Sequence, residues 1–518
     1  MKPLITSFSG RLCATALAIA CAFPALAQDQ SQPAGSVSAV APVASSTSWT
    51  LKDLISRLRA ENKTIRSKQT DSRIAATGVD RAMSAFQPTV SVSAVRGISE
   101  TKNSFEEDLV RKDLGIYRRE SNDYNLGLTQ LLSSGAKLEL KTSLSNYVTN
   151  NNLLDPGRPP GVYDAKTQYG FTITQPLMRD AGSEVTMARV NVAKLDTTSA
   201  EHTARETETS VVAETAMAYH ELTLAQQRVV AAREKIQNAQ RLLLEARAMN
   251  VAGRLPDADV WEVENALSRY KAGLSEALQG ERERSNRLRT TILSVAALDV
   301  NNLRTADAMP AVMVLKVSPQ DALNVALLRR DDYLMRKVQV EREAVQVSYS
   351  ENQMKPRVDL VASYAKGALE YTNAITSWPN GASDYPTWSM GLQMSLPLGK
   401  NRQAQADIEA AMLRQTDAAL ALKALEVQIA NDIDTSFSML NSALERWQLW
   451  SDVHAREIQQ LEAEKLKFAA GRSDVREILL REERVVNSLL STQEQQLAFA
   501  RAELMLQAAQ GTLLDRFQ

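Results

Sequence analysis

Cysteine is nearly absent from this 518-residue chain, which contains only Cys13 and Cys21. Both lie in residues 1–27, a segment with the basic start, the apolar stretch and the final Ala-Leu-Ala of a secretory signal peptide. Cleavage after residue 27 would leave a mature chain without thiols, disulfides or cysteine-ligated metals. A faint lipobox at 18–21 keeps open the alternative that Cys21 accepts a lipid. Residues 28–48, rich in Ser, Ala, Gln and Pro, are expected to form a flexible leader.

A net excess of either charge is also missing. The chain has 60 Lys and Arg against 61 Asp and Glu, and loss of Lys2 and Arg11 with the signal peptide changes its formal charge from −1 to −3. Nucleic-acid binding needs a clustered basic excess, so nucleic acid is not an expected partner. After the signal segment no apolar run approaches the ~18 to 20 residues that a membrane-spanning helix needs, so no transmembrane helix is expected.

Residue patterns that carry catalysis are lacking as well. The three histidines, His202, His220 and His454, are isolated in stretches of helical pattern. The sequence has no HExxH zinc motif, no Cys–His pair and no glycine-rich phosphate loop. We therefore expect no enzyme activity, no catalytic site, no cofactor and no metal, and we expect the histidines to be ordinary packing or surface residues.

An internal repeat dominates what is present. Pro176-Leu177 is followed 77 residues after the proline by Gly253-Arg254, and Pro397-Leu398 is followed 74 residues after the proline by Gly471-Arg472. An acid lies six residues past each of these glycines, and a proline ends an earlier helical stretch in each copy, at Pro88 and Pro356. Such a repeat, with only 5% aromatic residues, favours long helices built twice on one plan.

Each copy is expected to run helix, strands, long helix, Gly-Arg turn, long helix. Repeat 1, residues 49–315, is predicted to contain helices at about 50–86, 183–250 and 257–298 and strands at about 89–97, 123–132, 136–147 and 166–175. Repeat 2, residues 316–518, is predicted to contain helices at about 319–354, 402–469 and 474–512 and strands at about 357–365 and 386–396.

The predicted strands alternate apolar and polar residues, as a strand does between two unlike solvents. In an exported protein, lipid outside and water inside a membrane barrel is one such pair, and a sheet half-buried on a soluble core is the other. The segment 183–250 lacks proline and glycine, so it predicts a rod on the order of 100 Å that must lie against other rods. Six strands cannot close a barrel alone, since about eight are needed, so several chains would have to share one.

The duplicated Pro-Leu junctions and Gly-Arg turns resemble those of the TolC-type family of outer-membrane efflux and secretion proteins, over about residues 49–515. The resemblance implies a mainly α fold with membrane β: a homotrimer whose shared β-barrel in outer-membrane lipid continues into a periplasmic α-helical coiled-coil tunnel. It also implies docking to a periplasmic adaptor and a proton-driven or ATP-driven inner-membrane pump. The implied function is export of small molecules or proteins, in a tripartite efflux pump or type I secretion system.

The charged residues after the two turns are the predicted site. The resemblance implies a periplasmic gate there, with these candidates: Arg254, Asp257, Asp259, Arg472, Asp474 and Glu477. Three positions depart from the family pattern, because Phe468 lacks a hydroxyl, Leu480 stands where an acid is usual and the basic residue is displaced to Arg472. The alternative is that the six residues are exposed helix caps or adaptor contacts.

Two further alternatives stay open. The chain could be a periplasmic or surface coiled-coil structural or adhesion protein whose strands form a soluble sheet.

Repeat 1 holds about 47 more residues than repeat 2 between its helices, including a hairpin signal at 123–147 around Ser133-Ser134-Gly135. If this hairpin joins the barrel, each protomer supplies six strands instead of the four usual in the family. Otherwise it folds over the outer surface or into the lumen.

Overall fold

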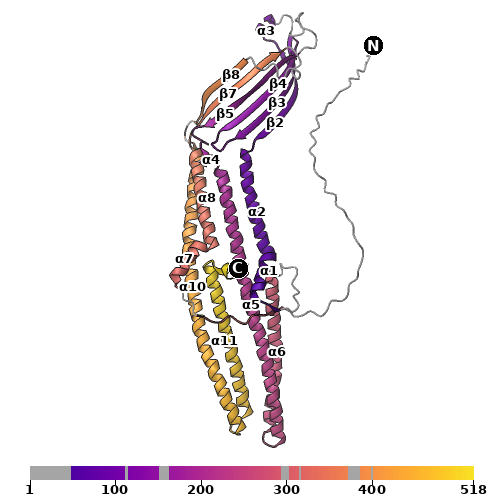
Figure 1. The fold of residues 1–518 in the computed structure, drawn as a ribbon, viewed down its shortest axis with the longest axis vertical. Coiled ribbons are helices and arrows are strands. Elements are labelled where there is room, and N and C mark those ends of the chain that lie inside the picture. The colour runs from indigo at the N-terminus through magenta and orange to yellow at the C-terminus, as the bar shows by residue number, and fades with distance from the viewer. Residues whose placement is uncertain are drawn as a thin grey trace, which may run out of the picture. The chain divides into compact units, whose positions relative to one another are not determined.

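The computed structural model describes residues 48–110, 115–150, 163–292, 303–313, 317–370, 385–397, 399 and 401–517. The expected signal peptide, both cysteines, the leader up to residue 47 and Leu398 lie outside these residues. The described chain forms one large antiparallel sheet and a set of long helices that run away from one end of its strands (Figure 1). Residue 48, the last of the expected leader, belongs to a short strand.

Four long helices form two antiparallel pairs. In repeat 1, α5 (Ala188–Val251) packs along α6 (Asp257–Ile292), and in repeat 2, α10 (Arg402–Ala469) packs along α11 (Val475–Ala509). The remaining helices are α1 (Leu51–Glu61), α2 (Lys63–Met83), α3 (Phe105–Val110), α4 (Ser183–Thr186), α7 (Pro319–Arg329) and α8 (Asp331–Gln353), with 3-10 turns at Ser84–Phe86 and Leu513–Phe517. Within the described residues, none of the helices combines the length and the apolar character that a membrane span requires.

Three helices that the sequence predicts as continuous are interrupted, and in the rod predicted at 183–250 the break is the single residue Met187 between α4 and α5. The rod predicted at 50–86 breaks at Asn62, whose extended backbone ends α1 and whose Oδ1 accepts from Thr64 N at 2.8 Å and Ile65 N at 3.1 Å, capping α2. The rod predicted at 319–354 breaks at Arg330, which bonds to Asp332 at 2.9 Å and to Asp432 at 3.0 Å. Local side-chain capping explains the break at Asn62, since an Asn amide competes with the helical backbone.

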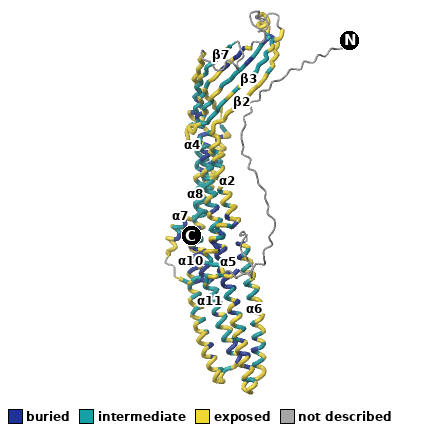
Figure 2. The backbone as a smooth tube through the Cα atoms, turned by 45° about the vertical axis from the view of Figure 1, so that its right-hand side comes forward, coloured by how far each residue is buried: buried dark blue, intermediate teal, exposed yellow. Residues whose placement is uncertain are grey.

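The buried core follows the helix contacts (Figure 2). Apolar residues spaced by three or four on α10 are buried, including Ile429, Ile433, Phe437 and Leu440. They pack against α7 and α11, and separate clusters join α5 to α1, α6 and α11. The helices are therefore held by a narrow apolar seam, as coiled-coil-like packing requires.

The sheet has six antiparallel strands in the order β2-β3-β4-β5-β7-β8. They are β2 (Thr89–Lys102), β3 (Ile116–Leu131), β4 (Lys137–Thr149), β5 (Asp164–Pro176), β7 (Arg357–Glu370) and β8 (Tyr385–Ser395). The hairpin predicted at 123–147 is β3–β4, and it lies inside the sheet, between β2 and β5. A second, two-stranded sheet pairs β1 (Ser48–Trp49) with β6 (Arg304–Thr305). No pattern in the sequence predicts these two short strands.

The two faces of the large sheet differ in chemistry. One row of directly paired residues crosses all six strands and is apolar throughout: Val90, Leu128, Leu140, Phe171, Tyr364 and Trp388. These side chains are exposed or half-buried, with Trp388 74% and Val90 61% exposed. The adjacent row, on the opposite face, is small or polar: Ser91, Gly127, Lys141, Gly170, Ala365 and Thr387. We call these the apolar face and the polar face.

Glycine placement shows which way the sheet curves. The glycines within its described strands all lie on the polar face: Gly97, Gly127, Gly170, Gly367 and Gly391. A Cβ added at Gly170 would meet Ala365 Cβ at 2.7 Å, and one added at Gly127 would meet Ser91 Oγ at 2.7 Å. Glycine within a strand marks a bend or a close approach of a neighbour. Side chains converge on the concave side of a bent sheet, so we infer that the polar face is concave.

Candidate functional site: the Gly-Arg turns and the strand-to-helix junction

The two Gly-Arg turns have the same geometry. Gly253 and Gly471 each have φ +71, the left-handed conformation that ends a helix at small energetic cost only in glycine. Each turn closes with the pair of backbone bonds of a Schellman motif. These bonds are Gly253 N to Asn250 O at 2.8 Å, Arg254 N to Met249 O at 2.8 Å, Gly471 N to Phe468 O at 2.9 Å and Arg472 N to Lys467 O at 2.9 Å. The duplicated sequence therefore folds into a duplicated reversal.

The candidates after the first turn lie at the start of α6. Asp257 and Asp259 are both in its first helical turn, where negative charge is favoured by the helix dipole. Asn250 at the end of α5 holds the loop, because its Nδ2 donates to Asp257 Oδ1 at 2.8 Å and to Leu255 O at 2.9 Å. Arg254 is exposed at the tip.

The candidates after the second turn begin α11. Asp474 is its N-cap, accepting from Glu477 N at 2.9 Å, and Glu477 in turn bonds Arg481 Nε at 2.9 Å. Arg472 is exposed. Below the turn, Glu464 accepts from Ser473 Oγ and from Lys467 Nζ, and these hydrogen bonds lower the pKa of its carboxyl. The capping role of Asp474 agrees with the alternative that some candidates are helix caps.

Near the two turns, an apolar cluster packs α5 and α6 against α11 within one chain. It consists of Leu242, Leu243, Ala246, Val263, Ala266, Val475, Ile478 and Leu479, from α5, α6 and α11. The six charged candidates do not form one network, since no ion pair between described residues links the first turn's group to the second's. Asp257 is instead bound to Asn250, and Glu477 to Arg481. Within the described residues the candidates therefore form two separate groups, one at each turn.

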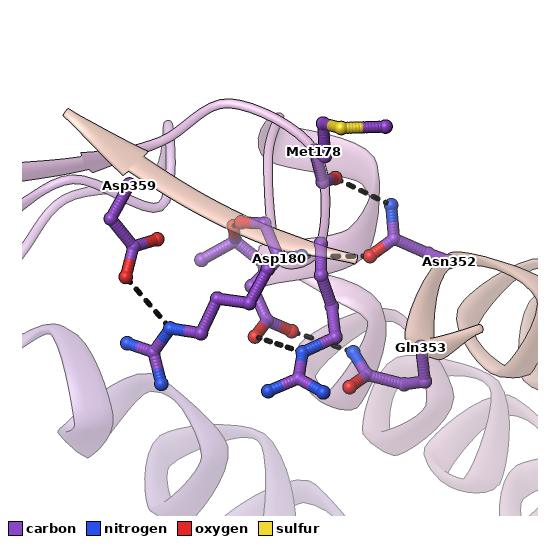
Figure 3. Close-up of polar contacts among 8 residues, drawn as sticks. Met178, Asp180, Asn352, Gln353 and Asp359 are labelled. Atoms are coloured by element: carbon purple, nitrogen blue, oxygen red, sulfur yellow. Dashed lines mark hydrogen bonds and ion pairs between the residues drawn. The ribbon is translucent and has the colours of Figure 1, made fainter. Parts of the chain in front are cut away.

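A second polar cluster, which the sequence did not predict, lies where strands give way to helices (Figure 3). Asp180, between β5 and α4, has φ +62, a conformation that is uncommon for residues other than glycine. Two residues at the end of α8 hold it: its backbone N–H donates to Asn352 Oδ1 at 2.8 Å, and Gln353 Nε2 donates to its Oδ1 at 2.6 Å. Asn352 Nδ2 also donates to Met178 O at 3.4 Å.

The turn of the β3–β4 hairpin is seated on the same cluster. Gly182 N donates to Ser134 O at 3.2 Å. A Cβ added at Gly135 would lie 2.4 Å from Asp180 O, so only glycine fits beneath it. We call Gly135, Asp180, Asn352 and Gln353 the Asp180 junction. It ties the inserted hairpin, the first repeat and the second repeat together.

Nearby polar atoms are incompletely satisfied. Asp359, on the polar face of β7, is 4% exposed, and its Oδ2 accepts from Arg357 Nε at 2.7 Å. The other oxygen of Asp359 and Nε of Arg179 have no hydrogen-bond partner among the described residues. The Pro176-Leu177 junction marks the nearby end of β5, but nothing local in the sequence pairs residue 180 with residue 352.

The histidines occupy packing positions. His202 Nδ1 bonds Asp331 at 2.8 Å and His454 Nδ1 bonds Ser488 Oγ at 3.0 Å. His220 is buried, and burial lowers its pKa to about 4. Across the ranges that the structure describes, no group of three or more His, Cys, Asp or Glu is placed to hold a metal ion.

No protein-family model matches the chain, and no curated protein matches it. Solved structures do match. The outer-membrane channel OprN is similar with a TM-score of 0.63 at 16% identity, over 89% of this chain and 90% of that one. The open-state MtrE outer membrane channel of Neisseria gonorrhoeae gives 0.60 at 15% identity, over 89% of both chains, and the outer membrane protein VceC of Vibrio cholerae gives 0.58 at 14%, over 89% and 96%. The resemblance to TolC-type channels is thus confirmed at the level of the fold: a strand-and-long-helix architecture shared with outer-membrane channels.

Proposed function

We propose that this chain is one protomer of an outer-membrane channel that exports material without catalysis. The apolar face carries this proposal. Fifteen large apolar or aromatic side chains on it are more than a third exposed: Val90, Val92, Ile98, Ile116, Tyr124, Leu126, Leu140, Tyr169, Phe171, Ile173, Tyr364, Trp388, Met390, Leu392 and Met394. A contiguous apolar patch of this extent is rare on a monomer in water, whereas the lipid-facing surface of a membrane barrel is apolar.

The rest of the architecture supports the same proposal. The polar face would line a water-filled lumen, and the paired rods α5–α6 and α10–α11 would continue the lumen as a periplasmic tunnel. At 1.5 Å per residue, the 64 residues of α5 make a rod of about 100 Å, long enough to reach far into a periplasm. The channel similarity adds a homotrimer to the proposal, together with a periplasmic adaptor and a proton-driven or ATP-driven inner-membrane pump as partners.

The charged turns are proposed as the periplasmic gate of this channel. Arg254, Asp257 and Asp259 lie at one reversal, and Arg472, Asp474 and Glu477 lie at the other. In a symmetric trimer these six positions would form rings of charge around the end of the tunnel. Such rings close or select by electrostatics at short range.

Cell fractionation and planar-bilayer recording test the proposal together. The full-length protein should be found in outer-membrane vesicles, and the purified assembly should insert into bilayers and give discrete conductance steps. The competing structural or adhesion protein with a soluble sheet predicts release with the soluble periplasm by osmotic shock. Recovery there, without any bilayer activity, would remove the channel from consideration.

A further inference from the structure

We propose that the membrane wall of this channel contains six strands from each protomer, including the β3–β4 hairpin, and that β8 of one copy pairs with β2 of the next in the register that joins Ser395 to Thr89. This inference rests on the proposed channel function. It adds the composition of the wall and the identity of the surfaces that close it.

The unpaired strand edges point to a second copy as the partner. β2 and β8 are the two ends of the sheet, and every residue of β8 is exposed. In lipid, an unpaired edge leaves N–H and C=O groups without any hydrogen-bond partner, and lipid cannot supply one. Because all five neighbouring pairs are antiparallel, β8 runs opposite to β2, so joining the two edges continues the antiparallel pattern.

The hairpin lies in the wall and is neither folded over the outer surface nor placed in the lumen. β3 pairs with β2 along the whole of Thr89–Lys102, and β4 pairs with β5 from Lys137 to Tyr147. Leu128 and Leu140 continue the exposed apolar row without a gap, while Lys141 lies on the polar face. At its base the hairpin is fixed by the close contact of Gly135 with Asp180.

Comparison of the two repeats shows that the hairpin is an insertion. In repeat 2, the strand after the proline-ended helix, β7, pairs directly with the strand before the next long helix, β8. In repeat 1 the corresponding strands are β2 and β5, and β3–β4 separates them. Repeat 1 therefore places four strands above α2 and α5, whereas repeat 2 places two above α8 and α10.

The register follows from the ends of the edge strands. Thr89 and Ser395 are the helix-side ends of β2 and β8, so both lie at the same boundary of the wall. Pairing them sets Met394 opposite Val90 and Leu392 opposite Val92, apolar against apolar. A shift by one residue would set apolar against polar side chains.

The stagger in this register fits a closed barrel. Paired residues lead straight across the sheet from Thr89 to Ser389, through Thr129, Glu139, Thr172 and Ser363. Ser389 lies six residues before Ser395, which is one residue of stagger per strand. With a rise of about 3.3 Å and a strand spacing of about 4.8 Å, this gives a tilt of about 35°. Barrel strands tilt by roughly 35–45°. A trimer would then close with about eighteen strands, half again as wide as a twelve-stranded barrel.

Disulfide trapping tests the register, and residues 28–518 contain no cysteine that could compete with the introduced pair. Val90→Cys combined with Met394→Cys should convert most of the protein in outer-membrane vesicles into a covalent trimer on oxidation. The matched control, Ala94→Cys with Met394→Cys, places the thiols four residues out of register and should stay monomeric on a denaturing gel. Cross-linking of the control pair instead of the first pair would overturn the register.

Thiol labelling tests whether the hairpin is in the wall. A membrane-impermeant maleimide should label Leu140→Cys at least ten-fold more slowly than its neighbour Lys141→Cys, because lipid covers the first and water the second. Leu138→Cys and Leu144→Cys should be protected like Leu140→Cys. Fast labelling at Leu140→Cys with protection at Trp388→Cys would overturn the six-stranded wall and leave the channel standing. Fast labelling at both sites would overturn the channel itself.

Discussion

His220 illustrates how burial sets the chemistry of a single residue. Its ring packs edge-on against Tyr219 at 5.8 Å between centroids, and its Nδ1 has no partner among the described residues. Desolvation first, and then the charge of Arg516, lower its pKa to about 4, although Asp307 opposes the shift. The folded protein therefore holds this imidazole neutral at physiological pH.

Acid should destabilise the fold through His220. The unfolded chain binds a proton near pH 6.5 and the folded chain only near pH 4, so the contribution of His220 is intact above pH 6.5 and is lost as the pH falls toward 4. The full loss is about 3 kcal/mol per chain. Melting temperatures of the unmodified protein and of His220→Gln, measured from pH 7 to pH 4.5, should converge as the pH falls. Parallel curves would contradict the burial of a neutral ring.

Replacement by alanine should have opposite effects on stability at a glycine with positive φ and at a glycine within a helix. Gly471→Ala forces a Cβ into φ +71 and should destabilise the assembly by about 1 kcal/mol per chain. Gly273→Ala, within α6 and facing open space, should stabilise it by roughly 0.5–1 kcal/mol. Thermal or urea unfolding of the two variants should move in opposite directions. Equal shifts would mean that the left-handed turn at Gly471 does not form.

At the scale of elements, one carboxylate joins three helices. Glu221 on α5 has an 8% exposed side chain and bonds Arg284 on α6 at 2.5 Å, Arg287 on α6 at 3.4 Å and Arg501 on α11. Because the acceptor is buried while the arginines stay half-exposed, it is the shared anchor of the group. The two helical pairs are thereby linked away from the turns.

Removal of this anchor should weaken the packing of α5 against α11. Glu221→Gln keeps the shape but loses the charge, and we expect destabilisation of about 2 kcal/mol, as for hydrogen bonds to charged groups. Glu494→Gln is the control, since its ion pair with Arg228 is exposed on both sides and contributes about 0–1 kcal/mol. The free energies of unfolding of both variants should be measured by chemical unfolding. An equal loss in the two variants would show that burial does not strengthen the bonds between Glu221 and its arginines.

The Gly-Arg turns carry the prediction on gating. Asp259→Ala combined with Glu477→Ala should raise single-channel conductance with little change in trimer stability, because the partly exposed Glu477–Arg481 pair contributes only about 0–1 kcal/mol and Asp259 at the start of α6 about 0.3–1 kcal/mol through the helix dipole. Glu276→Ala with Glu462→Ala removes two exposed acids from α6 and α10 away from the turns, and conductance should stay at the starting level. Unchanged conductance in the first variant would count against a gate at these turns.

Local patterns located most elements from the sequence alone. The rod predicted at 402–469 matches α10, and each predicted strand lies largely within an observed strand, which extends up to seven residues further. The spacing of apolar residues shows which face of an element is apolar, so the pattern is clear in the middle of an element. It is lost toward strand ends, because both faces are polar there. The breaks at Asn62 and Arg330 were missed because their flanking residues keep the helical spacing.

At the scale of the whole molecule, the duplicated motifs were enough to predict the architecture that the solved channels share. They gave no account of contacts across the repeats. Asp180 meets residues 172 and 173 positions away, and Glu221 meets Arg501 across 280. Such contacts depend on the relative placement of finished elements, and no spacing in the chain encodes them. The paired charges at the turns pointed to a location, but the actual partners, Asn250 and Arg481, came only with the structure.

The inserted hairpin has a consequence for circumference. Six strands about 4.8 Å apart and tilted by about 35° occupy about 35 Å of arc per protomer. The four helices that meet the sheet, α2, α5, α8 and α10, occupy about 32–40 Å at ordinary packing distances. The totals agree, although neither repeat balances by itself, and the Asp180 junction ties the segment after β5 in repeat 1 to the end of α8 in repeat 2 at this boundary. A four-stranded wall at the same tilt would span only about 23 Å of arc. In the proposed channel, deleting the hairpin would therefore shorten each protomer's share of the wall from about 35 Å to about 23 Å, and the remaining strands would have to tilt further to span the same helices.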